Sequence, residues 1–231
     1  MLVLELFSGT GSVGKNAKKR GYKVISVDSD IDSKADIKVD ILDWDYKSLN
    51  LKPDFIWASP PCGSFSNMAM TSNKNSKIRQ RSRHTPSMKP LNELAVLGDK
   101  VLKKTIEIIN YYRKLNPKLK FVVENPHGNM WRSPYMKKLK PYSTAYTYYC
   151  LYADNRKKPT DFFNNFNLDL KKGKCRALVS VQQVRTGTMG GVRDEAAARL
   201  GKVGIPLCER YKIPQKLLDD IFTQMKNKKI T

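Results

Sequence analysis

Short apolar runs alternate with amphipathic stretches along most of the chain. The runs predict buried strands at residues 2–6, 24–27, 37–39 and 55–58, and a further one that starts at Phe121. Apolar residues at helical spacing predict helices at about residues 13–20, 91–115 and 213–225. Strands that alternate with helices indicate an α/β domain built on a mostly parallel sheet.

The next stretch, residues 143–152, has a different pattern, in which small and aromatic side chains alternate as they do along a strand. Residues 160–164 are predicted to be its antiparallel partner, and a cationic run, Arg156 to Lys158, lies between the two. The chain has 231 residues, 40% of them hydrophobic, which suffices for one α/β domain with a core and little more.

Charge and cysteine content narrow the classes of partner and compartment. Lys and Arg number 43 against 21 Asp and Glu, and the net charge of +22 favours a nucleic-acid partner over a merely soluble, lysine-covered surface. No apolar run reaches membrane-spanning length and Met1 leads straight into a strand, so we expect no membrane partner and no cleaved signal. The four cysteines form no CxxC pair, so we expect no metal site, no disulfide framework and an intracellular, reducing compartment, cytoplasm or nucleus.

Cys62 is the first candidate for chemistry. It follows the apolar run at residues 55–58, and Pro60 and Pro61 before it remove two backbone donors and fix φ, so the chain leaves the sheet as a stiff loop. The crevice outside the carboxyl ends of parallel strands is the expected place for a nucleophile. The alternative is that Cys62 is one more small buried hydrophobe.

The first predicted strand leads into a glycine-rich turn and a helix, a succession typical of nucleotide-type sites. The turn consists of Phe7, Ser8, Gly9, Thr10 and Gly11. Asp28 ends the second strand, where an acid can accept both hydroxyls of a ribose, and the alternative is an exposed turn residue. Asp40 and Ile41 follow the third strand. Asp40 could hydrogen-bond an adenine amino group, and Ile41 could cover the face of the adenine. The turn lacks the lysine of a phosphate-binding loop, which favours a cofactor with adenosine and no phosphate.

A second strand end carries polar residues. The run that starts at Phe121 ends in Glu124, Asn125 and Pro126. Two neighbouring strands would then present Cys62 and Glu124 to one crevice, which brings a nucleophile and an acid together.

With these residues considered together, the chain resembles the DNA cytosine-5 methyltransferase family. The hallmarks of that family are a Pro-Pro-Cys loop followed by Phe-Ser, here Pro60, Pro61, Cys62, Phe65 and Ser66, and a Glu-Asn-Pro strand end, here residues 124–126. The sequence LELFSGTGSVG resembles the family's cofactor loop, so three motifs fall in the right order over about the first three fifths of the chain.

The resemblance implies a Rossmann-like class I methyltransferase fold: a mostly parallel sheet with an antiparallel hairpin at the end and helices on both faces. It implies S-adenosylmethionine as cofactor and methyl transfer to carbon 5 of cytosine through a covalent Cys62 adduct, with Glu124 as the acid. The cofactor residues that it implies are Phe7, Ser8, Gly9, Thr10, Gly11, Asp28, Asp40, Ile41 and Pro60.

The resemblance also assigns roles around the acid. Asn125 and Pro126 would fix its direction by shaping the chain exit. The family often has a Gln-x-Arg-x-Arg element on the hairpin, whose arginines help to hold the target base. Here the glutamine is missing, and Arg156 and Lys158 take the places of the arginines.

Residues 67–90, called here the basic segment, are polar and rich in cations. A segment this long is either a solvated excursion or a mobile lid that closes over nucleic acid. One histidine in such a segment suits a phosphate or water contact, so His84 is given no catalytic role. The candidate nucleic-acid contacts are Ser64, Arg79, Arg81, Arg83 and Arg185.

We therefore expect a catalytic, S-adenosylmethionine-binding domain at residues 1–165, a reduced basic recognition segment at 166–206, and a closing helix with a lysine-rich tail at 207–231. The expected partner is DNA. Two alternatives stay open: an RNA cytosine-5 methyltransferase on the same framework, and a non-catalytic nucleic-acid-binding protein or subunit that keeps the fold.

Overall fold

The computed structural model of the 231-residue chain describes residues 1–70, 79–83, 88–174, 179–180 and 211–230. Arg185, His84 and most of the predicted recognition segment lie outside these residues.

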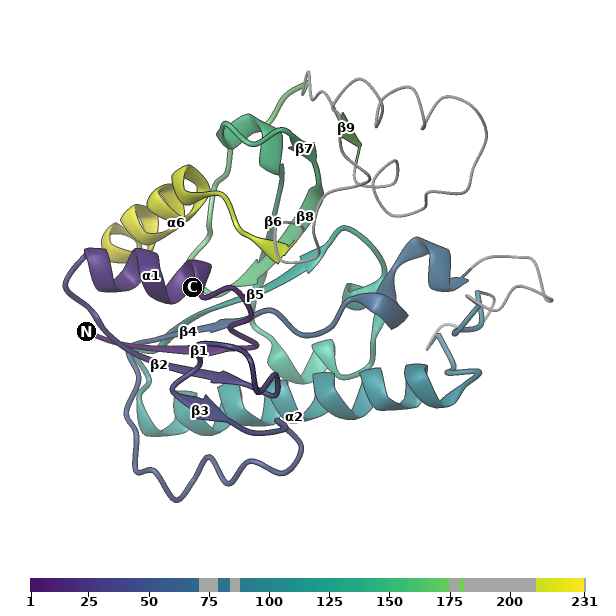
Figure 1. The fold of residues 1–231 in the computed structure, drawn as a ribbon, viewed down its shortest axis with the longest axis horizontal. Helices are drawn as coiled ribbons and strands as arrows, with labels where there is room; N and C mark the ends of the chain where they lie inside the picture. The colour runs from purple at the N-terminus through teal and green to yellow at the C-terminus, as the bar shows by residue number, and fades with distance from the viewer. Residues whose placement is uncertain (71–78, 84–87, 175–178, 181–210, 231) are drawn as a thin grey trace.

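A seven-stranded sheet with the order β3-β2-β1-β4-β5-β8-β6 forms the centre of the fold (Figure 1). The strands from β3 to β5 in this order run parallel to their neighbours, whereas β8 runs antiparallel to both β5 and β6. A separate parallel pair joins β7 to β9. The strands are β1 Leu2–Leu6, β2 Lys23–Asp28, β3 Ile37–Lys38, β4 Phe55–Ala58, β5 Lys120–Pro126, β6 Ser143–Tyr148, β7 Arg156–Lys157, β8 Pro159–Asn164 and β9 Val179–Ser180.

Helices cover both faces of the sheet. In Figure 1, α1 and α6 lie above the strands and α2 lies below them. The predicted fold class, a mostly parallel sheet that ends in an antiparallel hairpin with helices on both faces, is confirmed. The helices are α1 Ser12–Lys19, α2 Glu93–Leu115 and α6 Gln215–Asn227.

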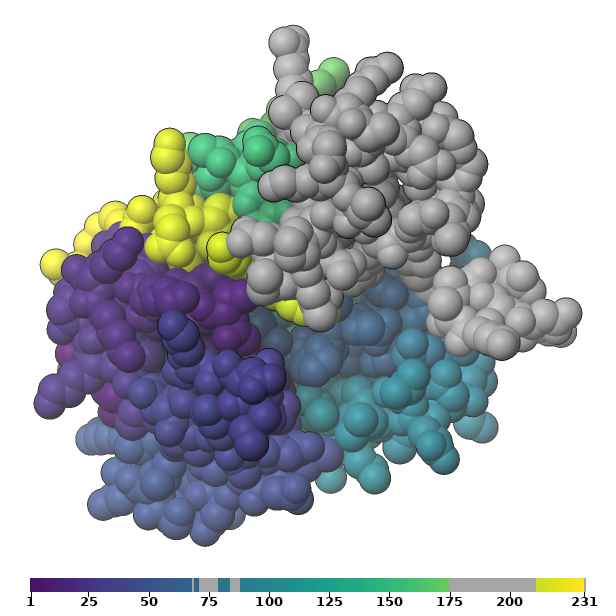
Figure 2. Space-filling model, viewed as in Figure 1, coloured from purple at the N-terminus to yellow at the C-terminus, as the bar shows by residue number. Residues whose placement is uncertain are grey.

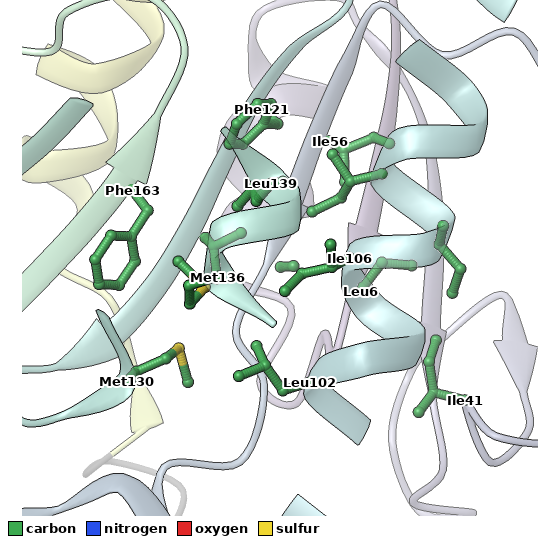
Figure 3. Packing of buried hydrophobic residues seen from close by; sticks show 14 of the residues in the cluster. Leu6, Ile41, Ile56, Leu102, Ile106, Phe121, Met130, Met136, Leu139 and Phe163 are labelled. Carbon is green, nitrogen blue, oxygen red and sulfur yellow. The ribbon is translucent and has the colours of Figure 1, made fainter. Parts of the chain in front are cut away.

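Alternation along the strands divides the core into two layers. In β1, Val3 packs with residues of α1 and α6, whereas Leu4 and Leu6 pack on the α2 side, because successive side chains of a strand point to opposite faces. Figure 3 shows the second layer, where Leu102 and Ile106 of α2 pack in one cluster with Leu6 and Ile56 of the strands. The core layer in which a strand residue packs therefore depends on whether its position along the strand is odd or even.

Helix α2 begins and ends at residues that satisfy its free backbone groups. The side chain of Asn92 accepts a hydrogen bond from the Ala95 N–H at 3.0 Å, and Asn116 donates its own N–H to the Tyr112 carbonyl. The apolar stripe of the helix ends in Tyr112, whose hydroxyl donates to the Tyr46 carbonyl at 2.7 Å. The stripe thus packs α2 against the parallel strands in one core cluster.

The carboxyl-terminal helix returns to the start of the chain. Asn16 of α1 donates to the Asp219 carboxylate of α6 at 3.0 Å, and the Ile213 N–H donates to the Ser12 hydroxyl at 3.3 Å. Figure 2 shows this contact on the surface, where the yellow carboxyl-terminal residues lie against the purple amino-terminal ones. Ile213 and the first turns of α6 consequently reach the region that follows β1.

Two expectations were wrong. Residues 149–152 do not continue the strand as predicted but form the 3-10 turn Tyr149–Tyr152, which ends where Ala153 adopts a left-handed φ of 60°. Cys150 is disulfide-bonded, although the absence of a CxxC pair led us to expect no disulfide framework.

Candidate active site

The Cys62 thiol is held at the carboxyl edge of the sheet by its neighbours on both sides. Cys62 is half-buried and precedes the 3-10 turn Gly63–Phe65, whose last N–H donates to the Cys62 carbonyl at 3.0 Å. The Asn125 side chain donates to the Pro60 carbonyl at 3.1 Å, which ties the loop to the end of β5. This hydrogen bond is one through which Asn125 could shape the region, as predicted.

Two glycines allow the loop to be packed this closely. A Cβ at Gly128 would lie 2.6 Å from the Phe65 carbonyl oxygen, and a Cβ at Gly98 of α2 would lie 2.2 Å from the Ser64 hydroxyl. Both distances are far below van der Waals contact, so each position needs a residue without a side chain. The Cys62 loop is wedged between α2 and the chain that follows β5.

The Glu124 side chain lies on the α1 face of the sheet and is 7% exposed. The Tyr149 hydroxyl donates to Glu124 Oε1 at 3.1 Å, and the Lys158 ammonium lies 3.7 Å from the same oxygen. Lys158 also lies 4.8 Å from the centre of the Tyr149 ring. A buried carboxyl group with one cation and one neutral donor beside it can act as an acid or as a hydrogen-bond acceptor.

The turn after β1 contains a series of positive φ angles. Phe7 has φ 61°, Gly9 47° and Gly11 67°, and only the phenylalanine is in a conformation unfavourable to its residue type. Strain of this kind is common at ligand sites. The Gly9 N–H donates to Asp28 Oδ2 at 2.6 Å, so the acid at the end of β2 holds the turn.

Glu5 lies directly beneath this turn. It is 2% exposed, and its carboxyl group accepts the Gly14 N–H of α1 at 2.9 Å. Burial raises the pKa of Glu5 to about 8, against the opposing effect of the Gly14 and Val13 backbone donors. A proton on this side chain is therefore available near neutral pH.

These parts meet in one cavity. Of the predicted cofactor residues, Phe7, Ser8, Gly9, Thr10 and Pro60 line it, whereas Gly11, Asp28, Asp40 and Ile41 do not. The Ser8 hydroxyl is buried and has no hydrogen-bond partner among the described residues, which marks a place for a polar ligand group. The cavity is lined by Glu5, Phe7, Ser8, Gly9, Thr10, Ser12, Val13, Trp57, Ser59, Pro60, Pro61, Cys62, Glu124, Pro126, Lys158, Tyr211 and Ile213.

The nucleic-acid contacts predicted for Arg81 and Ser64 need correction. Arg81 is 1% exposed, and its guanidinium bonds the Ser64 carbonyl at 2.7 Å and the Asp99 carboxylate at 2.8 Å. Ser64 is 5% exposed and accepts a further bond from Arg81. A cation so enclosed holds the Cys62 loop to α2 and is not presented to a phosphate.

The other predicted cations lie in varied surroundings. Arg79 is half-buried and Arg83 is exposed. Arg156 is buried, pairs with the Asp154 carboxylate and donates to the Lys212 carbonyl at 2.8 Å. Of the two hairpin cations expected to hold the target base, only Lys158 lines the cavity.

Several lining residues were not predicted. Glu5 had a signal in the sequence, because it is the one charged residue of the apolar run at residues 2–6. Trp57 was assigned only to the core. Tyr211 and Ile213 had no local signal, since about two hundred residues of chain separate them from the turn that they complete.

A mostly parallel sheet with a glycine turn after its first strand is the arrangement of a Rossmann-like α/β fold, and here a thiol and a buried acid line the same cavity as that turn. No protein-family model matches the chain. The chain is 31% identical over 235 residues to a probable DNA (cytosine-5)-methyltransferase of Frog virus 3 (isolate Goorha), with 96% of this chain and 98% of that protein covered. It belongs to the DNA (cytosine-5)-methyltransferase family, as the resemblance of its motifs predicted.

Solved structures with a similar fold have lower identity. S. pombe Dnmt2 methyltransferase is 14% identical with a TM-score of 0.45, and the match covers 85% of this chain and 58% of that one. A SAM-dependent methyltransferase from Archaeoglobus fulgidus is 13% identical with a TM-score of 0.38, covering 71% and 85%. The chain thus spans less than two thirds of the length of the Dnmt2 protein. No helix in the described part of the chain has the length and apolar character needed to cross a membrane.

Proposed function

We propose that this protein transfers a methyl group from S-adenosylmethionine to carbon 5 of cytosine in DNA, with Cys62 as nucleophile and Glu124 as acid. The observation that carries the proposal is that one cavity is lined by the Cys62 loop, the Glu124 carboxyl group and the glycine turn after β1. The description of the viral relative as a probable DNA (cytosine-5)-methyltransferase supports DNA as the substrate.

The residues of the cavity fit the cofactor. Phe7, Ser8, Gly9, Thr10 and Pro60 would hold it, and the unpartnered Ser8 hydroxyl would gain a hydrogen bond. Asp28 supports the same turn through the Gly9 N–H. When bound, S-adenosylmethionine supplies the methyl group as an electrophile.

Cys62 would activate the cytosine ring for methyl transfer. Carbon 5 of the ring is a poor nucleophile, and addition of the thiolate sulfur to carbon 6 turns the ring into an enamine that can attack through carbon 5. Glu124 would relieve the charge that develops by donating a proton or a hydrogen bond to ring nitrogen 3. After transfer, a base such as water removes the proton on carbon 5, the bond between sulfur and carbon 6 breaks, and a proton donated to ring nitrogen 3 returns to Glu124, which restores the thiolate and the acid and releases methylated cytosine.

The target base must leave the helix for this chemistry. Carbon 6 is inaccessible inside a stacked duplex, so the nucleotide is flipped out or is already single-stranded. Lys158 lines the cavity, which supports a role for it in contacting such a base or its backbone.

The experiment that tests the proposal uses DNA that contains 5-fluorocytosine. Fluorine at carbon 5 blocks the last elimination, so the wild-type protein with cofactor should form a covalent complex that survives denaturing electrophoresis. Cys62→Ser should form no complex while it still binds the cofactor in calorimetry. Glu124→Gln should form it more slowly, because loss of an acid typically costs ~10² to 10⁴ in rate.

Two outcomes would contradict the proposal. Methylation by Cys62→Ser at the wild-type rate would exclude the thiol as nucleophile. Incorporation of labelled methyl groups into RNA but not into DNA would show that the substrate is RNA and not DNA.

A further inference from the structure

The Glu124 carboxyl group is approached from one side only by the described residues. The hydroxyl of Tyr149 donates to Oε1 at 3.1 Å, and the Lys158 ammonium lies 3.7 Å from the same atom. The other oxygen, Oε2, has no hydrogen-bond partner among the described residues, although Glu124 lines the cavity. One oxygen is therefore held by the protein while the other is left for a ligand.

Tyr149 is suited to be a permanent donor. The side chain is 0% exposed and packs in the core layer of α1 and α6 with Trp57 and Phe162. Burial, followed by the charge of Glu124, raises the pKa of the Tyr149 phenol well above its ordinary value. The shift favours the protonated, hydrogen-bond-donating form of the phenol, and the packed ring limits the directions in which that proton can point.

The two groups that hold Oε1 differ in what they control. Lys158 acts on the carboxylate through its charge, because its ammonium lies 3.7 Å from Oε1, beyond hydrogen-bond distance. Tyr149 has a ring fixed by packing, so its hydrogen bond sets the rotation of the carboxyl group. A carboxyl group without that bond keeps its charge interaction but loses a defined direction.

We infer that Tyr149 is a positioning residue, which turns the Glu124 carboxyl group so that Oε2 faces ring nitrogen 3 of the target base. The inference rests on the proposed role of Glu124. Tyr149 does not line the cavity, so it acts on the base through Glu124 and not by contact.

The chain offers a matched control on the same turn. Tyr152 is also buried, at 2% exposed, but its hydroxyl donates to the Asp220 carboxylate at 2.9 Å and accepts the Lys171 N–H at 2.9 Å. Tyr149→Phe and Tyr152→Phe each remove one buried hydroxyl from residues 149–152, and only the first removes a contact with Glu124.

We expect Tyr149→Phe to lower kcat for methyl transfer by about 10- to 100-fold, the effect of losing a hydrogen bond to a charged group. The KM for the cofactor should not change. Tyr152→Phe should keep the wild-type kcat. Equal kcat values for the two variants would overturn the inference.

A double mutant separates positioning from a general structural defect. In single-turnover assays, Tyr149→Phe should have little further effect in a Glu124→Ala background, because no carboxyl group is left to direct. The same fold-loss in both backgrounds would show that Tyr149 supports the fold and not the acid.

A measurement without turnover keeps this test apart from the proposed function. The carboxyl carbon-13 NMR signal of Glu124, assigned with Glu124→Gln, should move in Tyr149→Phe and stay in place in Tyr152→Phe. A wild-type protein that methylates no substrate would overturn the proposed function, whereas a Glu124 signal that ignores Tyr149→Phe would overturn the positioning role.

Discussion

Glu5 lies where an acid is least expected, in the middle of an apolar strand and against the first turn of α1. Its carboxyl group accepts the Gly14 N–H, and a Cβ at Gly14 would lie 2.5 Å from Glu5 Oε2, so the helix can approach the strand only with a glycine there. Burial raises the pKa of Glu5 to about 8. The same side chain lines the cavity, so its protonation state bears on both folding and the site.

The raised pKa predicts how stability depends on pH. In the unfolded chain Glu5 loses its proton near pH 4.5, and in the folded protein near pH 8, so folding takes up a proton between these values. Stability is therefore lost as pH rises through this window, by up to about 1.4 kcal/mol per pH unit. Glu5→Gln removes this loss.

Urea unfolding at pH 5, 6.5 and 8 checks the prediction. The free energy of unfolding of Glu5→Gln minus that of the wild type should increase with pH, because all other titrating groups are shared by the two proteins. Parallel pH dependences would show that Glu5 is charged throughout the range.

At this scale, prediction from sequence succeeded where a residue follows a strand directly. Cys62, Glu124 and the turn at residues 7–11 were placed at one edge because the carboxyl ends of neighbouring parallel strands meet there, and the structure brings them to one cavity. It failed for Arg81, because a cation in a polar segment gives no sign of the buried carboxylate that it will meet.

Arg81 joins two elements that are separate in the sequence, the 3-10 turn after Cys62 and α2. Its guanidinium bonds the 3-10 turn after Cys62, the Ala95 carbonyl near the start of α2 and the Asp99 carboxylate, and it lies 4.3 Å from the centre of the Phe65 ring. Arg81 of the basic segment is thereby attached to the Cys62 loop. We expect this attachment to stabilise the loop more than any exposed cation can.

Arg81→Ala should lower the free energy of unfolding by about 3 to 5 kcal/mol, because it leaves a largely buried carboxylate without its cation. Arg83→Ala is the control: that side chain is exposed, and its loss should change stability by no more than about 0.5 kcal/mol. Chemical denaturation of the two variants measures the difference. Equal midpoints for both variants would contradict the buried role of Arg81.

The elements themselves were more predictable than their contacts. The strands at residues 2–6 and 55–58 and the long helix were found close to their observed bounds, because apolar runs and helical spacing are local signals. The 3-10 turn at residues 149–152 was predicted as strand, because it continues an aromatic-rich run although the adjacent Tyr148 and Tyr149 break the alternation where the backbone turns. Its position decides whether Tyr149 reaches Glu124, so that contact could not be predicted.

On the scale of the whole molecule, the excess of cations is the property that no single site explains. The net charge is +22, and buried pairs such as Arg81 with Asp99 use few of the 43 Lys and Arg residues. Most of the charge is thus left to act on a polyanion at the surface. A small domain with this charge should bind DNA mainly through phosphates.

The salt dependence of DNA binding tests this expectation. If six or more phosphates are engaged, affinity should fall by ~10³ or more between 50 and 200 mM salt, because each contact releases condensed counterions. Arg83→Ala, which removes an exposed cation of the basic segment, should reduce the slope of log affinity against log salt by about one if Arg83 touches a phosphate.

Arg81→Ala, in contrast, should leave that slope unchanged in any fraction that stays folded, since its guanidinium is occupied by protein groups. A flat salt response of the wild type would refute the electrostatic account. A slope lowered by Arg81→Ala would show that Arg81 contacts a phosphate after all.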